Sequence, residues 1–358
     1  MEEAVDIIAL TRWMDSESLG KGPITGFRLL AGGTQNILAH FERDGRAFIL
    51  RRPPLHLREN SNVTMRREAQ LLAALSNTAI PHPGLIAACG DPSVLGAAFY
   101  LMEPIDGFNA KAGLPALHSG LSSVRRRMGL AMVEAAAALG MVDYVAAGLD
   151  GFGKPEGFLE RQVGRWRRQL ESYEALDGWP GTASIPGISE VAAWLEARRP
   201  EEARPGIVHG DYHIANVMFR PDSGELAAVV DWELATIGDP LIDLGWLMAT
   251  WPETADESEV QPWDGFPSIG EMIEHYGRFS DRDLSHIQWY GVLACYKLGI
   301  ILEGTYARAC AGLAAKETGD RLHAKTVALF KRALLMIEAA GAEGHGDTAT
   351  TNTASANS

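Results

Sequence analysis

One stretch of sequence, IVHGDYHIANVMF at residues 207–219, decides the fold. In it, Asp211 and Asn216 follow the spacing D-x-x-x-x-N between two short apolar runs. A turn rich in Pro, Asp, Ser and Gly comes next, and then a further apolar run at 226–230 that ends at Asp231. Carboxylate and amide oxygens are the ligands that Mg²⁺ prefers, and a carboxylate can also accept the proton of a hydroxyl group. The stretch therefore contains candidates for a general base and for two metal ligands.

The residues before this stretch have the pattern of a small β-sheet. Residues 1–20 favour a short amphipathic helix, and residues 63–75 favour a second helix with Leu and Met at helical spacing. Apolar runs separated by Gly, Pro and Asp turns predict strands at 27–31, 36–41, 47–51, 85–89 and 98–103. The Asp44-Gly45 pair predicts a hairpin turn between the second and third strands. We therefore expect a five-stranded sheet with one helix inserted after its third strand.

Beyond Pro104 the sequence becomes mainly helical. Apart from the β-rich region around 206–232, helices are expected at 124–147, 159–173, 189–198 and from 241 to about 340. The Gly-, Ala-, Thr- and Ser-rich tail at 341–358 has no hydrophobic pattern and is expected to be disordered. The chain is thus predicted to divide into an N-terminal lobe at 1–104, a helical lobe at 105–340 and a tail.

Composition excludes several classes of protein. The 358 residues are 46% hydrophobic and hold 32 Lys and Arg against 46 Asp and Glu, a net charge of −14, which argues against a nucleic-acid surface. Cys89, Cys295 and Cys310 lack metal-binding spacing and fit a reducing, cytoplasmic compartment. The acidic start lacks the basic region of a signal peptide, and the apolar stretches contain charges that argue against a membrane span. The oligomeric state is not readable from the sequence.

The H-G-D-x-x-x-x-N run, followed by a hydrophobic strand and Asp231-Trp232-Glu233, resembles the aminoglycoside phosphotransferase and choline kinase superfamily. Gly210 stands where protein kinases have Arg, as it does in that superfamily. The resemblance implies an α+β, protein-kinase-like two-lobe fold, with a small antiparallel N-terminal lobe that binds ATP. It also implies that Asp211 is the catalytic base, that Asn216 and Asp231 bind Mg²⁺, and that the acceptor is a hydroxyl group of a small molecule.

The same resemblance assigns residues to the nucleotide. Gly32, Gly33 and Thr34 would form the turn that covers the phosphates, because glycines let backbone N–H groups approach them. The third strand ends in Arg51 where the superfamily has Lys, and Glu68 on the following helix would pair with it. Arg52 is the alternative for this role, since strand alternation cannot choose between the two without the register.

The segment after the fifth strand resembles the hinge between the lobes of a kinase. The adenine ring would meet the backbone of Glu103 and Ile105, with Met102 behind it. Asp239 and Asp243, around the start of a helix, are interpreted as structural, with Asp243 bracing the loop that contains Asp211.

Residues 158–166 and 296–304 resemble a branch related to the kinase domains associated with acyl-CoA dehydrogenases. That likeness implies a hydroxylated acyl group or acyl-CoA as acceptor rather than an aminoglycoside. Side chains that could line an acceptor pocket could equally be helix core or a packing surface: Arg161, Arg165, Trp166, Trp289, Tyr290, Lys297, Tyr306 and Arg308. Two other functions stay open, a nucleotide-binding regulatory module with weak catalysis and a Mg²⁺-dependent hydrolase.

Overall fold

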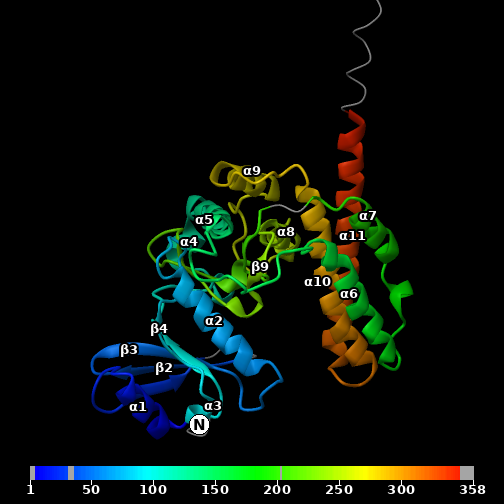
Figure 1. The fold of residues 1–358 in the computed structure, drawn as a ribbon. Helices are drawn as coiled ribbons and strands as arrows, with labels where there is room; N and C mark the ends of the chain where they lie inside the picture. Colours follow the sequence, from blue (N-terminus) through cyan, green and yellow to red (C-terminus); the bar gives the residue numbers. More distant parts are fainter. Residues whose placement is uncertain (1–4, 31–35, 202–203, 347–358) are drawn as a thin grey trace, which may run out of the picture. The chain divides into compact units, whose positions relative to one another are not determined.

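The computed structural model describes residues 5–30, 36–201 and 204–346. The chain forms two compact units (Figure 1). The first unit comprises Met1–Gly153, Ile214–Thr236 and Thr254–Ser268, and the second comprises Lys154–His213, Ile237–Glu253 and Ile269–Ser358. The chain therefore crosses between the units inside the D-x-x-x-x-N stretch, after His213.

A five-stranded antiparallel sheet forms the N-terminal part of the first unit, as the sequence predicts. Its strands are β1 (Thr25–Leu29), β2 (Ile37–Arg43), β3 (Arg46–Arg52), β4 (Leu85–Cys89) and β5 (Phe99–Met102), in the order β1-β2-β3-β5-β4. The predicted hairpin turn between β2 and β3 is confirmed. Asp44 and Gly45 both have positive φ, 52° and 74°, as a tight turn of this hand requires.

Alternating side chains of β3 point to opposite faces of the sheet. Phe48 and Leu50 join the apolar cluster with α1 (Ile7–Ser16), where Leu10 is fully buried. Arg51, on the opposite face, reaches Glu68 of α2 (Ser61–Leu75). This alternation, which has a period of two, decides which of the two arginines at the end of β3 faces the helix.

The rest of the first unit is built on α5 (Ser122–Met141) and the short hairpin β7 (Val217–Phe219) and β8 (Leu226–Val229), with α3 (Pro92–Leu95) and α4 (Ala116–Gly120) as connecting helices. The expectation of a helix reaching residue 147 is wrong. Val142 is extended, with φ −60° and ψ 128°, and the carboxylate of Asp143 accepts the N–H groups of Val145 and Ala146. That side chain offers the backbone a turn in place of further helix.

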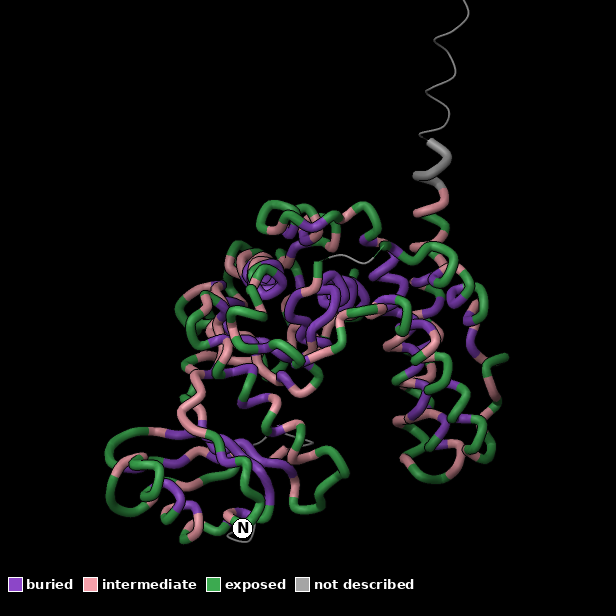
Figure 2. Tube along the Cα trace, in the orientation of Figure 1, coloured by how far each residue is buried: buried purple, intermediate pink, exposed green. Residues whose placement is uncertain are grey.

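The second unit is mainly helical. Its elements are α6 (Glu160–Glu171), α7 (Ile188–Ala197), α8 (Leu241–Thr250), α9 (Ile269–Phe279), α10 (Ile287–Cys310) and α11 (Lys316–Gly346), with β6 (Gly206–Val208) paired to β9 (Thr236–Gly238). Helix α8 is buried along nearly its whole length (Figure 2). At Gly238 a Cβ would lie 2.5 Å from the Phe158 ring, so only glycine fits the end of β9. Strand β9 was not predicted from the sequence.

The fold is the α+β, two-lobe, protein-kinase-like fold that the sequence predicts. Helix α11 continues beyond Ala340 to Gly346, and the remainder of the predicted tail, 347–358, lies outside the described residues. The lobe boundary at residue 104 stays a prediction. Within the residues described, no helix is both long and apolar enough to cross a lipid bilayer.

Candidate active site

Arg51 stands at the centre of a buried ionic cluster in the first unit. Its Nε lies 2.8 Å from Glu68 Oε2, and its second terminal nitrogen donates to Asp231 Oδ1 at 2.9 Å. Tyr100, the β5 residue opposite Arg51 in the sheet, donates its hydroxyl to Glu68 Oε2 at 2.9 Å. The guanidinium thus joins a helix, a strand and the residue that follows β8.

Burial disfavours the charged forms of Arg51 and Glu68, and the contacts within the cluster favour them. Burial alone would lower the pKa of Arg51, but Glu68, Tyr100 and Asp231 together hold that pKa above its ordinary value. Burial raises the pKa of Glu68, and Arg51 and Tyr100 counteract the rise. An ionised carboxylate in such surroundings needs both its cation and its hydrogen bonds. The cluster is therefore a single ionic unit whose members depend on one another.

Asn216 precedes the β7–β8 hairpin and Asp231 follows it, so both lie at the end of the hairpin opposite its turn. The backbone N–H of Val230 donates to the carbonyl of Asn216 at 2.9 Å, which closes the hairpin at this end. Asp231 then adopts φ 66° and ψ 62°, a left-handed conformation that few residues other than glycine use. Its side chain is 40% exposed, whereas Asn216 is buried. The hairpin thus holds an amide and a carboxylate side chain at the end opposite its turn.

The connecting segment after β5 is bonded to the same hairpin. Phe108 and Phe219 exchange both backbone hydrogen bonds at 2.9 Å, and the side-chain amide of Asn109 donates to the carbonyl of Ala215 at 2.6 Å. Gly107 is required here, because a Cβ would lie 2.8 Å from Ala227 Cβ. The segment that resembles a kinase hinge therefore also fixes the position of Asn216.

The other predicted nucleotide residues are only partly described. Gly32, Gly33 and Thr34 lie outside the described residues. Met102 ends β5 and is half-buried, Ile105 is half-buried, and Glu103 is exposed. The Glu103 backbone N–H donates to Gly84 at 2.8 Å, and its carboxylate contacts Arg46 at 3.2 Å. The predicted contacts of these residues with adenine stay predictions.

Asp211 belongs to the second unit, where two side chains hold its carboxylate. Trp246 of α8 donates its indole N–H to Asp211 Oδ1 at 2.8 Å, and His213 Nε2 lies 3.3 Å from the same oxygen. Burial alone would raise the pKa of Asp211, but His213, His209 and Trp246 outweigh it and lower that pKa to about 2. Asp211 therefore stays ionised throughout the physiological range.

The loop that contains Asp211 is braced from α8 and α10. Asp243 accepts the backbone N–H groups of His209 at 2.6 Å and Gly210 at 2.9 Å, the bracing role that the sequence predicts. Lys297 of α10 donates to the carbonyl of Gly210 at 2.9 Å. Burial lowers the pKa of Lys297 to about 8 and raises that of Asp243 to about 6. Gly210 itself has φ 86°, which favours glycine at this position.

Sequence reasoning missed two residues of these networks. Trp246 follows Asp243 at helical spacing i, i+3, so the two side chains share one face of α8 and reach the same loop. Tyr100 lies opposite Arg51 in the register, which a strand pattern without pairing does not reveal. The spacing of Asp243 and Trp246 was a signal that could have found Trp246. No sequence signal pointed to Tyr100.

The structure also shows where two aromatic residues of α10 lie. Trp289 is buried and donates to the carbonyl of Leu195 at 2.9 Å, and Tyr290 is buried and donates to Asp239 at 2.6 Å. Both are helix core, which was the alternative interpretation of each. Asp239 also accepts the N–H of Leu241 at 3.0 Å and is structural, as predicted.

Comparison with known proteins identifies the family. Residues 26–272 match the model of the phosphotransferase enzyme family, APH, and the chain belongs to that family. The expected relation to the aminoglycoside phosphotransferases is confirmed. A Ralstonia eutropha JMP134 protein assigned to the aminoglycoside phosphotransferases shares the fold with TM-score 0.76 and 28% identity, over 92% of this chain and 98% of that one.

A curated relative and a second solved structure were also compared with the chain. Acyl-CoA dehydrogenase family member 10 of Mus musculus is 30% identical over 81% of this chain but only 27% of its own length, so the chain spans about a quarter of that relative. The aminoglycoside phosphotransferase APH(4)-Ia, solved in a ternary complex with AMP-PNP and hygromycin B, shares the fold with TM-score 0.58 and 14% identity, over 90% of this chain and 98% of that one. The predicted likeness to domains associated with acyl-CoA dehydrogenases is confirmed.

Proposed function

We propose that the chain is an ATP- and Mg²⁺-dependent kinase that transfers the γ-phosphoryl group to a hydroxyl group of a small molecule. The observation that carries the proposal is the buried Arg51 guanidinium, which contacts Glu68 and Asp231 at once. A cation on the nucleotide phosphates, a helix carboxylate that holds this cation and a carboxylate for the metal are the parts that phosphoryl transfer requires.

The chemistry of the donor set fits magnesium. Asp231 offers a half-exposed carboxylate and Asn216 an amide oxygen, both hard ligands, and the metal usually takes only one or two ligands from the protein. When bound, the ion neutralises charge on the phosphate oxygens. In this proposal Asn216 and Asp231 hold it, Arg51 contacts phosphate oxygens, and the segment Met102–Ile105 holds the adenine, with Gly32, Gly33 and Thr34 over the phosphates.

Asp211 accepts the proton of the acceptor hydroxyl as the new oxygen–phosphorus bond forms. The bond between the γ-phosphorus and the bridging oxygen breaks, and ADP leaves with the electron pair of that bond. A carboxylate with a pKa of about 2 is a weak base, which suits a loose transition state in which the nucleophile forms little bond. Trp246 and His213 keep the carboxylate ionised and oriented.

For the acceptor we propose a hydroxyacyl group or hydroxyacyl-CoA. The similarity to acyl-CoA dehydrogenase family member 10, at 30% identity, supports an acyl acceptor, whereas the APH(4)-Ia complex with hygromycin B supports an aminoglycoside at only 14% identity. The Ralstonia eutropha protein, at 28% identity, also has the name of an aminoglycoside phosphotransferase, so the proposal follows the highest of the three identities.

Replacing Asp211 by Asn tests the catalytic assignment. Asp211→Asn should lower kcat for ATP consumption with a hydroxyacyl-CoA by roughly 10²–10⁴-fold, the usual contribution of a general base, while AMP-PNP binding by calorimetry stays within about twofold. Asp222→Asn, at an exposed turn residue, is the matched control and should keep full activity. Unchanged turnover in Asp211→Asn would overturn the base assignment.

The two alternative functions predict other outcomes. Nucleotide binding without ATP consumption across hydroxyacyl-CoAs and aminoglycosides would favour the regulatory module. Metal-dependent hydrolysis without nucleotide would favour the hydrolase.

A further inference from the structure

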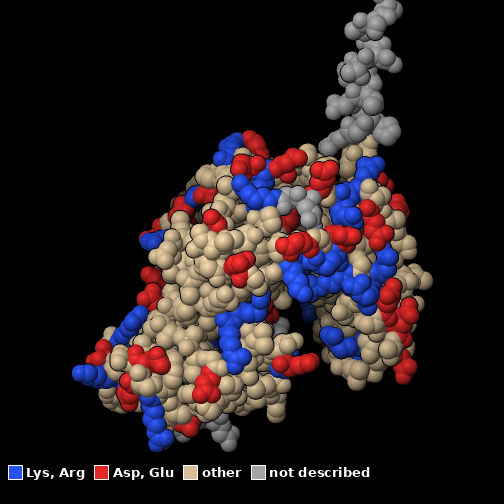
Figure 3. All heavy atoms as spheres, in the orientation of Figure 1, with Lys and Arg blue, Asp and Glu red and all other residues tan. Residues whose placement is uncertain are grey.

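Helix α6 of the second unit presents three arginines on one face. Arg161, Arg165 and Arg168 are spaced i, i+4 and i+7, which places them in one row along the helix. Arg161 is fixed by the carbonyls of Glu156 and Lys154. Arg167 lies on another face and pairs with Glu196. Figure 3 shows Lys and Arg side chains gathered over the part of the second unit that contains α6.

This row is connected to Asp211 by a chain of aromatic and cationic contacts. The guanidinium of Arg165 lies 5.2 Å from the centre of the Trp166 ring, and the ammonium of Lys297 lies 5.7 Å from the same ring. Lys297 also lies 4.1 Å from the ring of Trp246, whose N–H donates to Asp211. These contacts therefore link the carboxylate of Asp211 to Arg165 on the exposed side of α6.

The groups on this face have unused binding capacity. Arg165 and Arg168 are exposed, and neither forms an ion pair with a carboxylate in the described parts of the second unit, although the protein has a net charge of −14. Two other exposed arginines of this unit, Arg204 and Arg278, are paired with Asp281 and Glu274. The indole N–H of Trp166 is buried and meets no acceptor among the described residues. A buried donor without a partner is unfavourable, which favours a ligand that would satisfy it.

We propose that the exposed arginines Arg165 and Arg168 of this row, with Trp166 beside Arg165, bind the phosphate-bearing part of the acceptor. This inference rests on the proposed function and deepens it. Guanidinium groups bind phosphate through paired N–H donors, and an indole flanked by cations can stack on a flat heterocycle. The acceptor is thus an anion with phosphate groups, such as an acyl thioester of a nucleotide-containing carrier. The same face repels a polycationic aminoglycoside, because both would carry positive charge.

Calorimetry with adenosine 3′,5′-bisphosphate tests this site directly. The nucleotide site is first saturated with AMP-PNP and Mg²⁺, so that heat reports a second site. The double variant Arg165→Ala/Arg168→Ala should weaken binding by about tenfold or more, whereas Arg165→Lys/Arg168→Lys should lose less because the charge remains. Arg167→Ala is the matched control, since it removes one arginine of the same helix from another face, and should bind as the parent chain does.

The kinetic counterpart separates this site from the reaction itself. With a hydroxyacyl-CoA acceptor, the double alanine variant should raise KM with kcat unchanged, and with the matching N-acetylcysteamine thioester, which lacks phosphate, it should behave as the parent chain does. No bisphosphate binding by the parent chain, or equal binding by all variants, would overturn the site. If no acceptor supports ATP consumption but the binding pattern holds, the proposed function fails and the anion site stands.

Discussion

Arg51 contacts two carboxylates that come from separate places in the chain, Glu68 on α2 and Asp231 beyond β8. A guanidinium has donors on three nitrogens in one plane and can serve both partners together, whereas the ammonium of lysine is a compact point charge on a flexible stem. The departure from the superfamily's usual lysine is therefore consistent with retained function, because the planar group also holds the proposed metal ligand in place.

Exchange of Arg51 for lysine should separate these two duties. Arg51→Lys keeps the charge but cannot span both carboxylates, so we expect a loss of about 1–2 kcal/mol in the free energy of unfolding, measured by urea titration. Arg51→Met leaves Glu68 buried without its cation and should cost about 3–5 kcal/mol. In Arg51→Lys, KM for ATP should rise severalfold, because a single ammonium group cannot contact Asp231 and Glu68 at the same time.

Arg46→Lys is the control for this exchange. Arg46 lies at the other end of β3, and its contact with Glu103 is exposed, so the substitution should change stability by less than about 0.5 kcal/mol. An Arg51→Lys variant as stable as the parent chain, with unchanged KM for ATP, would show that the double contact has no energetic role.

The residue scale also shows where sequence reasoning is limited. The spacing of Asp211, Asn216 and Asp231 was sufficient to identify the family, because those residues lie in one continuous stretch. Which of Arg51 and Arg52 faces Glu68 could not be read without the strand register, in which Arg51 lies opposite Tyr100. The contact of Trp246 with Asp211 joins residues far apart in sequence, and no local propensity encodes it.

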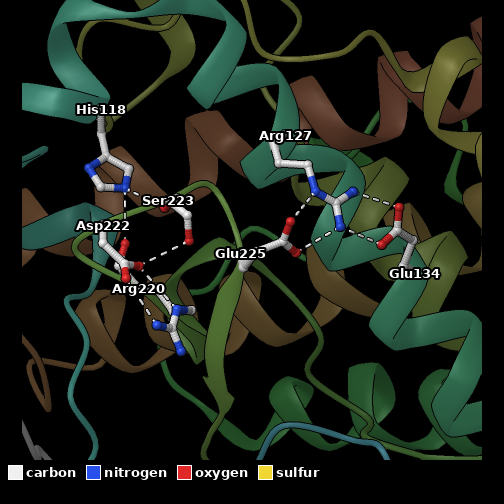
Figure 4. Close-up of polar contacts among 7 residues, drawn as sticks. All are labelled: His118, Arg127, Glu134, Arg220, Asp222, Ser223 and Glu225. Atoms are coloured by element: carbon white, nitrogen blue, oxygen red, sulfur yellow. Dashed lines mark hydrogen bonds and ion pairs between the residues drawn. The ribbon is translucent and has the colours of Figure 1, made fainter.

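Among the elements, the β7–β8 hairpin positions both proposed metal ligands, Asn216 and Asp231. Figure 4 shows its turn held against α4 and α5. The Nε2 of His118 lies 3.1 Å from the carbonyl of Arg220 and 2.8 Å from that of Ser223, so this nitrogen carries the proton and donates. At Gly224 a Cβ would lie 2.7 Å from the carbonyl of Val124, so the turn approaches α5 as closely as only glycine allows.

Arg127 of α5 is the charged part of the same attachment. Its guanidinium donates to Glu134, two turns further along α5, and to Glu225 of the hairpin, with distances of 2.6–2.7 Å (Figure 4). We expect Arg127→Ala to lower the free energy of unfolding by about 1 kcal/mol, because the group is partly exposed. Hydrogen exchange of the amides in β7 and β8 should quicken, while that of β2 and β3 stays unchanged.

A substitution in the turn of the hairpin is the control for the Arg127→Ala exchange experiment. Arg220→Ala removes an exposed pair with Asp222 and should leave exchange in β7 and β8 within error. Equal exchange in Arg127→Ala and the parent chain would mean that His118 and the packing of Gly224 hold the hairpin without the ion pairs.

Elements were predicted from the sequence best where one local signal dominates. The Asp44-Gly45 turn and the five strands followed from turn residues and apolar runs, and the structure has a turn and five strands at these positions along the chain. The end of α5 was missed because the alanine-rich pattern continues past Met141, whereas the Asp143 side chain captures the next N–H groups. Strand β9 was missed because three residues paired with a distant strand carry no periodicity.

At the scale of the whole molecule, the proposed nucleotide and metal site can be tested by itself, because its described residues belong to one compact unit. That unit, the first, contains Arg51, Asn216 and Asp231. A ligand that binds only the folded chain stabilises it by mass action, by about 2.7 kcal/mol at a hundredfold excess over its Kd. The size of that stabilisation therefore reports on the nucleotide and metal site without any need to know the acceptor.

AMP-PNP at this excess should raise Tm by roughly 5–10 °C when Mg²⁺ is present, given about 2–4 °C per kcal/mol for domains of this size. Without Mg²⁺ the shift should be smaller, because Asp231 and the phosphates then face each other with less compensating charge. Asp231→Asn should keep the metal-free shift and lose most of the additional shift that Mg²⁺ provides, whereas Asp222→Asn should respond as the parent chain does. If Mg²⁺ adds nothing to the shift of the parent chain, or adds as much to Asp231→Asn, then Asp231 does not hold the metal. The Arg51–Asp231 contact would in that case serve the stability of the first unit alone.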